Sequence, residues 1–202
     1  PLSLGAPMLF PHDLPDADVR HLPAWLSPAE ADALQRDLQA GVPWEVHRIR
    51  MFGSWVDSPR LSCWIGDPQA RYLYSGAEFV PHPWPPSLQG MRERLQDDGF
   101  GRFNSVLLNR YRSGGDYMGW HSDDEPELGP APVIASLSLG AARRFLLRRR
   151  DDPAQKTEYL LGHGDLLVMA GQTQRYYQHA LPKMARVQGE RINLTFRWIA
   201  PR

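Results

Sequence analysis

Three side chains of the sequence have the types and the spacing to bind a divalent metal ion together. His121 and Asp123 lie two positions apart, so in an extended segment both side chains project to the same side. His179 is the best third ligand, because it follows the strand-like run DLLVM, from which a β-sandwich can bring it beside the first two. Two imidazoles and one carboxylate form the facial triad of non-haem Fe(II) oxygenases, which leaves positions open for a co-substrate and O2. Zn2+ could bind the same three groups.

The run RINLTFR near the C-terminus supports this site with a cationic face. In a strand its residues alternate, so the polar side chains share one face and the apolar ones share the other. The polar members are Arg191, Asn193, Thr195 and Arg197. Such a face alone is more often exposed to solvent, but beside a metal site it suits a dicarboxylate, because guanidinium binds carboxylate bidentately and stays charged. In FNSVLLNRY, Asn109 and Tyr111 share a face and could hydrogen-bond the same ligand.

The elements that must position these residues are mainly strands. From Phe103 onward, short strand-like runs at regular spacing predict a mainly β fold with flanking helices, an antiparallel sandwich or jelly roll. A first helix is predicted over residues 27–41, where Ser27 is the N-cap and Glu30 follows three positions later. A second helix is predicted over residues 87–99.

Length and composition limit the class of protein. The chain has 202 residues, which favours one domain. Its 23 Lys and Arg residues balance 23 Asp and Glu residues, so no global positive field indicates a nucleic-acid or membrane partner. A single cysteine, Cys63, excludes an internal disulfide and favours a reducing compartment. No apolar run approaches the roughly 18 residues of a membrane span. We therefore expect a cytoplasmic protein, nuclear if the host is eukaryotic, and a monomer.

Several motifs together resemble the AlkB family of Fe(II)/2-oxoglutarate-dependent nucleic-acid dealkylating dioxygenases. They are NRY, HSDDE, IASLSLGAARRF, HGDLLVM, QHALPK and RINLTFR. The similarity extends from Met51 to Trp198 and is greatest to homologues that repair alkylated DNA in higher organisms. With this resemblance we expect a single dioxygenase domain over residues 1–202, with a double-stranded β-helix (jelly roll) and a nucleotide-recognition hairpin segment before it. Its expected parts are an N-terminal arm (1–26), a nucleotide-recognition lid (44–86) and a jelly-roll core (100–200).

The resemblance also implies an activity and the residues that perform it. Fe(II) would be bound by His121, Asp123 and His179, and the far carboxylate of 2-oxoglutarate would pair with Arg191. The other co-substrate contacts would be Asn109, Tyr111, Asn193 and Arg197. With O2 as second co-substrate, the implied reaction is oxidative dealkylation of bases such as 1-methyladenine and 3-methylcytosine in DNA. Formaldehyde and succinate would be released.

A substrate pocket is implied as well, because the family flips the damaged base out of the stack. Tyr72 could hydrogen-bond the base, Tyr74 could stack on it opposite His121, and Glu125 could read its exocyclic amine. Ordinary strand packing is the alternative for the two tyrosines. The remaining implied substrate contacts are Arg60, Ser75, Met51 and Phe52. The last two lie where related enzymes carry a hairpin that probes the duplex with an apolar wedge.

The substrate class leaves alternatives. Compared with the double-strand specialist of the resembled family, the connection RRRDDPAQKTE is shorter and PKMARVQGE carries fewer basic residues, so the resemblance favours single-stranded DNA, with duplex DNA and RNA as alternatives. The same chemistry could instead hydroxylate or demethylate a protein, RNA or a small molecule, and a β-sandwich that keeps a metal only for structure is a third reading. A basic cluster could contact phosphates or lie on a solvated edge. It comprises Arg143, Arg144, Arg148, Arg149 and Arg150.

Overall fold

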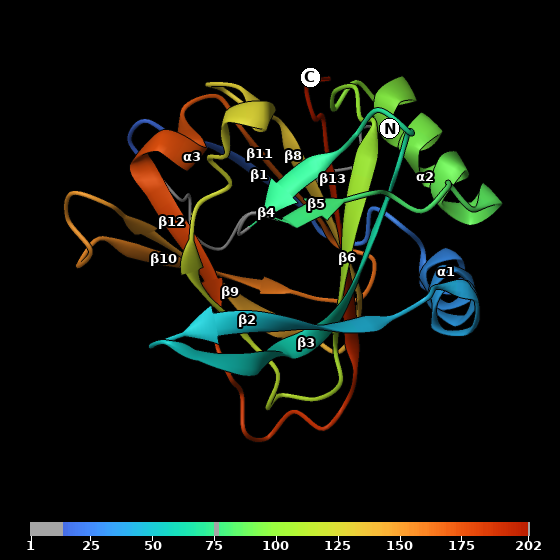
Figure 1. The fold of residues 1–202 in the computed structure, drawn as a ribbon, viewed down its shortest axis with the longest axis horizontal. Helices are drawn as coiled ribbons and strands as arrows, with labels where there is room; N and C mark the ends of the chain where they lie inside the picture. The colour runs from blue at the N-terminus through green and yellow to red at the C-terminus, as the bar shows by residue number, and fades with distance from the viewer. Residues whose placement is uncertain (1–13, 75–76, 202) are drawn as a thin grey trace, which may run out of the picture.

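Two antiparallel sheets form most of the fold in the computed structural model, which describes residues 14–74 and 77–201 (Figure 1). The larger sheet has seven strands in the order β1 (Asp18–Leu22), β11 (Leu166–Ala170), β8 (Ile134–Gly140), β13 (Arg191–Arg197), β6 (Ser105–Tyr111), β3 (Ser54–Gly66) and β2 (Glu45–Met51). The smaller has four in the order β10 (Lys156–Leu161), β9 (Arg143–Arg149), β12 (Tyr177–Leu181) and β7 (Met118–His121). This is the predicted jelly-roll type of fold.

Shorter elements complete the described part of the chain. A small hairpin pairs β4 (Tyr72–Tyr74) with β5 (Ala77–Phe79). The helices are α1 (Pro28–Gly41), α2 (Pro86–Asp97) and α3 (Thr173–Tyr176), with a short 3-10 helix η1 (Pro126–Leu128). None of the described helices is long and apolar enough to cross a membrane.

The alternating pattern of β13 separates a packed core from a polar interior. Ile192, Leu194 and Phe196 are fully buried in the main apolar cluster. Side chains of α1 and α2 belong to the same cluster, and Figure 1 shows both helices on one side of the molecule. The polar residues of β13 face the other way, toward the smaller sheet, because successive side chains in a strand point to opposite faces. The predicted alternation is therefore confirmed.

Both predicted helices are present. Ser27 caps α1 through its side chain, which accepts from the Glu30 backbone N–H, while the Glu30 carboxylate accepts from the Ser27 N–H. This reciprocal pair is the capping box that the sequence indicates. The second helix differs slightly from its predicted span of 87–99. It begins one residue earlier because Pro86 occupies the first turn, where its missing N–H costs nothing, and it ends at Asp97.

Strands from outside residues 100–200 extend the larger sheet at both edges. β1 comes from the segment expected as an arm and pairs with β11 from Asp18 to Leu22. The second half of β3, from Leu61 to Gly66, comes from the segment expected as a lid and pairs with β6. These residues join the sheet because strand pairing satisfies their backbone groups, and their apolar side chains add to the core. The role of residues 44–86 as a lid stays a prediction.

Asp165 stabilises the edge of the larger sheet where β1 pairs with β11. Its carboxylate accepts from the backbone N–H groups of Ala24 and Gly162, both at 2.9 Å, and lies 3.1 Å from His21 Nε2. Burial alone would raise the pKa of this carboxyl, but the three hydrogen bonds hold it below its ordinary value. A lowered pKa in the folded state means that ionised Asp165 stabilises the fold above the unfolded pKa, and that this contribution is lost as the pH falls.

We expect Asp165→Asn to reduce the acid sensitivity of the fold. The amide cannot ionise, so the variant lacks the stabilisation that the wild-type protein loses on acidification. Chemical denaturation at about pH 7 and about pH 3 should show a smaller drop in the free energy of unfolding for the variant, by about 1 kcal/mol. An equal drop in the two proteins would contradict this role.

Candidate active site

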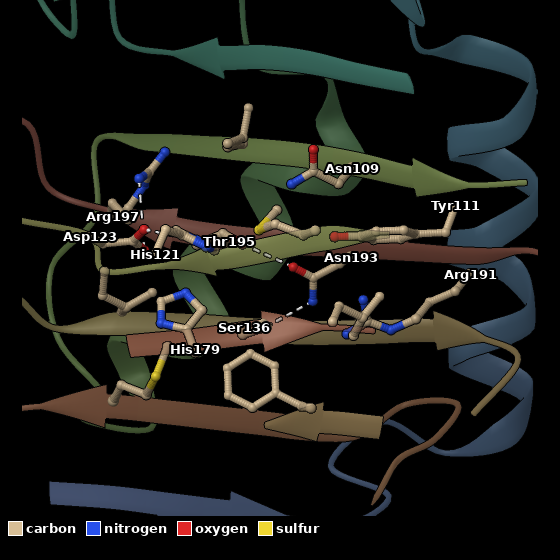
Figure 2. A pocket seen from close by; sticks show the side chains of 17 residues that line it. Asn109, Tyr111, His121, Asp123, Ser136, His179, Arg191, Asn193, Thr195 and Arg197 are labelled. Carbon is tan, nitrogen blue, oxygen red and sulfur yellow. Dashed lines mark hydrogen bonds and ion pairs between the residues drawn. The ribbon is translucent and has the colours of Figure 1, made fainter. Parts of the chain in front are cut away.

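A pocket between the two sheets is lined by all the residues predicted to hold the metal and the co-substrate (Figure 2). Its polar lining comes mainly from β6 and β13 of the larger sheet and from β7 and β12 of the smaller one. Figure 2 shows His121, Asp123 and His179 gathered near Arg197 at one end, while Arg191 enters from the other end. The pocket therefore has two chemically different ends.

The three predicted ligands converge at the first end. His121 ends β7, Asp123 follows it two residues later, and His179 lies on β12 directly opposite His121 in the strand pairing. The imidazole centroids are 4.2 Å apart. One donor atom from each residue lies within 4.8 Å of the others. These separations suit one shared divalent ion, because nitrogen and oxygen ligands bind such ions at about 2.0–2.2 Å.

Local hydrogen bonding prepares His121 for coordination. Its Nδ1 lies 2.8 Å from the Gly119 carbonyl, and since a carbonyl can only accept, Nδ1 carries the hydrogen. The lone pair is then on Nε2, which lies 3.6 Å from Asp123 Oδ1. That separation is too long for a hydrogen bond but suits two ligand atoms of one ion. A histidine whose second ring nitrogen donates to a carbonyl is the usual arrangement in protein metal sites.

The protonation states also suit a cation. Burial and, to a smaller extent, the neighbouring His121 lower the pKa of His179 to about 3, so the ring is neutral near pH 7. Burial alone would raise the pKa of Asp123, but Arg197 and the two imidazoles hold it below its ordinary value. Arg197 Nη1 lies 3.8 Å from Asp123 Oδ2. Neutral imidazole and ionised carboxylate are the forms that bind metal ions.

The second end of the pocket presents a buried cation. Arg191 is 2% exposed and donates through Nη2 to Ser138 Oγ at 2.9 Å. Its Nε is buried and has no hydrogen-bond partner in the described part of the chain. Burial lowers the pKa of this guanidinium to about 10, so it is still charged near neutral pH. A buried cation with an unused donor favours an anion in the pocket, because an isolated buried charge is costly.

Polar side chains between the two ends are held in fixed orientations. Asn193 donates both amide hydrogens, to Ser136 Oγ at 2.8 Å and to the Leu137 carbonyl at 3.2 Å. Its Oδ1 accepts from Thr195 Oγ1 at 2.9 Å. The Asn109 Oδ1 accepts from Arg60 Nε at 3.1 Å, and Figure 2 shows the amide nitrogen turned toward the pocket. The polar wall is thus preorganised for a polar ligand.

Sequence reasoning missed several residues of this site. Ser136 and Ser138 of IASLSLG support Asn193 and Arg191, and their two-residue spacing could have indicated a shared polar face. Phe145 stacks on His179 with ring centroids 5.3 Å apart. Gln174 accepts from the Asp123 backbone N–H at 2.9 Å. Nothing in the local sequence indicates these two contacts, because each joins segments far apart in the chain.

The residues predicted to contact the substrate are not brought together in the same way. Arg60 binds Asn109 and the Tyr117 carbonyl, outside the pocket lining. Glu125 precedes η1, and Phe52 is fully exposed at the turn between β2 and β3. The remaining predicted contacts are placed only in part: Tyr72 and Tyr74 belong to the backbone of β4, Met51 ends β2, and Ser75 lies outside the described residues. Their roles stay predictions.

Comparisons with known proteins decide the family. The model of the 2OG-Fe(II) oxygenase superfamily matches residues 18–197. The chain belongs to this superfamily. It is also 38% identical over 208 residues to the DNA oxidative demethylase ALKBH2 of Mus musculus, covering 94% of this chain and 87% of that protein. Alpha-ketoglutarate-dependent dioxygenase alkB homolog 3 of Homo sapiens is 38% identical over 188 residues, covering 89% of this chain and 65% of the relative.

These relatives place the chain in the AlkB family, so it is an oxidoreductase that uses Fe(II) and 2-oxoglutarate. Two solved structures share the fold at low sequence identity. OsALKBH1 gives a TM-score of 0.61 at 18% identity, covering 90% of this chain and 97% of its own. A 2OG-Fe(II) oxygenase from Burkholderia pseudomallei gives 0.58 at 17% identity, covering 91% and 88%. This chain spans less than two thirds of the length of human alkB homolog 3 but most of the length of mouse ALKBH2.

We expect Asp123→Ala to abolish tight metal binding by the protein. The variant loses a ligand and leaves Arg197 without its partner, so affinity should fall by more than the roughly 10- to 100-fold typical of losing a residue that merely supports a ligand. Titration of metal-free protein with Mn2+, followed by electron paramagnetic resonance, measures this directly. His82→Ala, which removes an exposed histidine away from the pocket, is the control and should bind as the wild type does. Unchanged affinity in Asp123→Ala would contradict the ligand assignment.

Proposed function

We propose that this protein repairs alkylated DNA by oxidative demethylation of bases such as 1-methyladenine and 3-methylcytosine. The observation that carries the proposal is the two-ended pocket, in which a His-Asp-His cluster faces a buried arginine. The identity to DNA oxidative demethylase ALKBH2 supports the substrate class, because it extends over 94% of the chain. The first end suits Fe(II) and the second suits the far carboxylate of 2-oxoglutarate.

In this proposal His121, Asp123 and His179 hold Fe(II), and Arg191 anchors the co-substrate. Arg197 keeps Asp123 ionised, since a nearby positive charge favours the carboxylate form. Arg191 supplies a charge-assisted bond to the anion, with Ser138 fixing the orientation of the guanidinium. Asn109 and Tyr111 complete the polar contacts from β6. Apolar side chains around the pocket exclude water; among them are Ile134, Phe145, Met169 and Leu181.

Bound Fe(II) would supply the oxidation, in which 2-oxoglutarate and O2 become succinate and CO2 while the N-methyl group is hydroxylated and then leaves as formaldehyde. The protein's own part is to orient both reactants and to keep the site dry. Phe145 packs on the His179 ring and limits its rotation. The Gly119 carbonyl fixes the tautomer of His121, so its free nitrogen faces Asp123.

For the strand preference, we propose single-stranded DNA. The basic cluster seen in the sequence offers few free cations for a second strand. Arg143 is fully buried, where it donates to three backbone carbonyls. Arg144 pairs with Glu158, and Arg149 pairs with Asp16 and Asp151. Cations that neutralise phosphates dominate binding to duplex DNA. Because these three arginines already bind groups of the protein, we favour single-stranded DNA, which is the less charged ligand. We also propose that the protein is a monomer.

We expect the protein to release formaldehyde from a methylated oligonucleotide when Fe(II), 2-oxoglutarate and O2 are present. In one competition assay, the same 3-methylcytosine is offered in single-stranded DNA, duplex DNA and RNA, and the repaired product of each is quantified by mass spectrometry. Single-stranded DNA should be consumed first. Turnover of methylated peptides in place of all three nucleic acids would refute the proposed substrate class.

We expect Arg191→Met to weaken the use of 2-oxoglutarate. The substitution removes the buried cation while keeping much of the side-chain volume, so the KM for 2-oxoglutarate should rise about 10- to 100-fold. Succinate formation at varied 2-oxoglutarate measures this KM, and Mn2+ affinity should change little. Arg144→Met is the matched control, because it removes an arginine that is paired outside the pocket. A normal KM in Arg191→Met would show that the co-substrate is anchored elsewhere.

A further inference from the structure

The arginine run at the end of β9 lies against the segments that carry the three proposed metal ligands. Arg148 and Arg150 are two positions apart, and both engage the residues next to those ligands rather than projecting freely into solvent. Arg149, between them, instead pairs with Asp16 and Asp151. The sequence suggested phosphate contacts or a solvated edge for this run, and its internal contacts indicate a different role.

Arg150 holds both neighbours of Asp123. Its Nε donates to Ser122 Oγ at 3.1 Å, and its Nη2 lies 2.7 Å from Asp124 Oδ2. The same Nη2 donates to the Gln174 carbonyl at 2.9 Å, in α3. A single planar guanidinium therefore connects the residue before Asp123, the residue after it and the helix packed beside them. Such a fork loses little freedom for each bond it forms.

Further bonds run from the same loop to α3 and β12. The Asp123 backbone N–H donates to Gln174 Oε1 at 2.9 Å, and Gln174 is 3% exposed. Ser122 Oγ donates to the Tyr177 carbonyl at 2.7 Å, two residues before His179. The loop of the carboxylate ligand is thus bonded to the segment that leads into the second imidazole ligand.

Arg148 holds the neighbours of the two histidines. Its Cζ lies 4.1 Å from the centroid of the Trp120 ring, which immediately precedes His121. Its Nε and Nη2 both donate to Gln178 Oε1, at 3.1 and 3.0 Å, and Gln178 immediately precedes His179. The contact bridges β7 and β12, whose backbone pairing is irregular just after the His121 and His179 pair. β7 also lies at the edge of its sheet, so it has no second strand to hold it.

We propose that Arg148 and Arg150 are positioning residues that hold His121, Asp123 and His179 at metal-binding separation. This inference rests on the proposed function, because it takes those three residues as the metal ligands. Its physical basis is that coordination distances tolerate only about 0.2 Å, so ligands on an irregular edge strand and a loop need support from outside the coordination sphere. The two arginines supply that support from the outer face of the smaller sheet.

The test compares Arg148→Ala and Arg150→Ala with the wild type in metal binding without co-substrate or DNA. Arg144→Ala is the matched control, because Arg144 lies on the same strand four positions before Arg148 and pairs with Glu158, away from the ligands. Mn2+ titration should show about tenfold weaker binding in each of the first two variants, and wild-type binding in the control. Arg150→Lys should not restore affinity, since two separate guanidinium nitrogens bind the three partners and a single ammonium nitrogen cannot occupy both positions.

A second readout separates positioning from general stability. The metal-free variants should unfold at nearly the wild-type temperature, while the visible absorption spectrum of Co2+ in Arg150→Ala should differ from the wild-type spectrum because the ligand geometry has loosened. Wild-type Mn2+ affinity and Co2+ spectra in both variants would overturn the inference. If binding to an oligonucleotide weakened in its place, the two arginines would be phosphate contacts. A wild-type protein that bound no Mn2+ would overturn the ligand assignment itself, and the proposed function with it.

Discussion

The pairing of β7 with β12 at His121 and His179 is the constraint on which the site depends. It places two imidazoles in contact although they are 58 positions apart in the sequence, and Asp123 reaches the same point because it follows β7 by two residues. Neighbouring elements support this pairing. The larger sheet supplies the facing wall, α1 and α2 bury its apolar side, and α3 fixes the loop of the carboxylate ligand.

Buried charges also determine which ligands the pocket suits. Asp123, Arg191 and Arg197 are all buried, so each of these charges needs compensation. Arg197 compensates Asp123 directly, whereas Arg191 is in contact, within the described part of the chain, with the Ser138 hydroxyl and the aromatic ring of Tyr111, 5.4 Å away. This asymmetry explains how one pocket can suit a cation at one end and an anion at the other. A ligand that carries a carboxylate would complete what the fold leaves uncompensated.

Sequence reasoning succeeded where local periodicity carries the information. The two-residue spacing of His121 and Asp123, the alternation of β13 and the capping box of α1 each follow from the geometry of a single element. It failed where contacts join distant segments. Gln174 lies 51 positions from Asp123. Alternation along β9 predicts which face each arginine occupies, but it cannot predict which residues the arginines contact. For the same reason the sequence does not indicate that β1 and β3 pair with strands of the larger sheet, because pairing between distant strands is decided by tertiary packing.

The account's central claim is that one pocket holds a metal ion on three side chains and a dicarboxylate between that ion and Arg191. A crystal structure of the protein with Mn2+ and 2-oxoglutarate tests it most directly. We expect the ion to contact His121, Asp123 and His179, and the far carboxylate to pair with the Arg191 guanidinium. An ion bound by other residues, or a co-substrate carboxylate turned away from Arg191, would contradict the account.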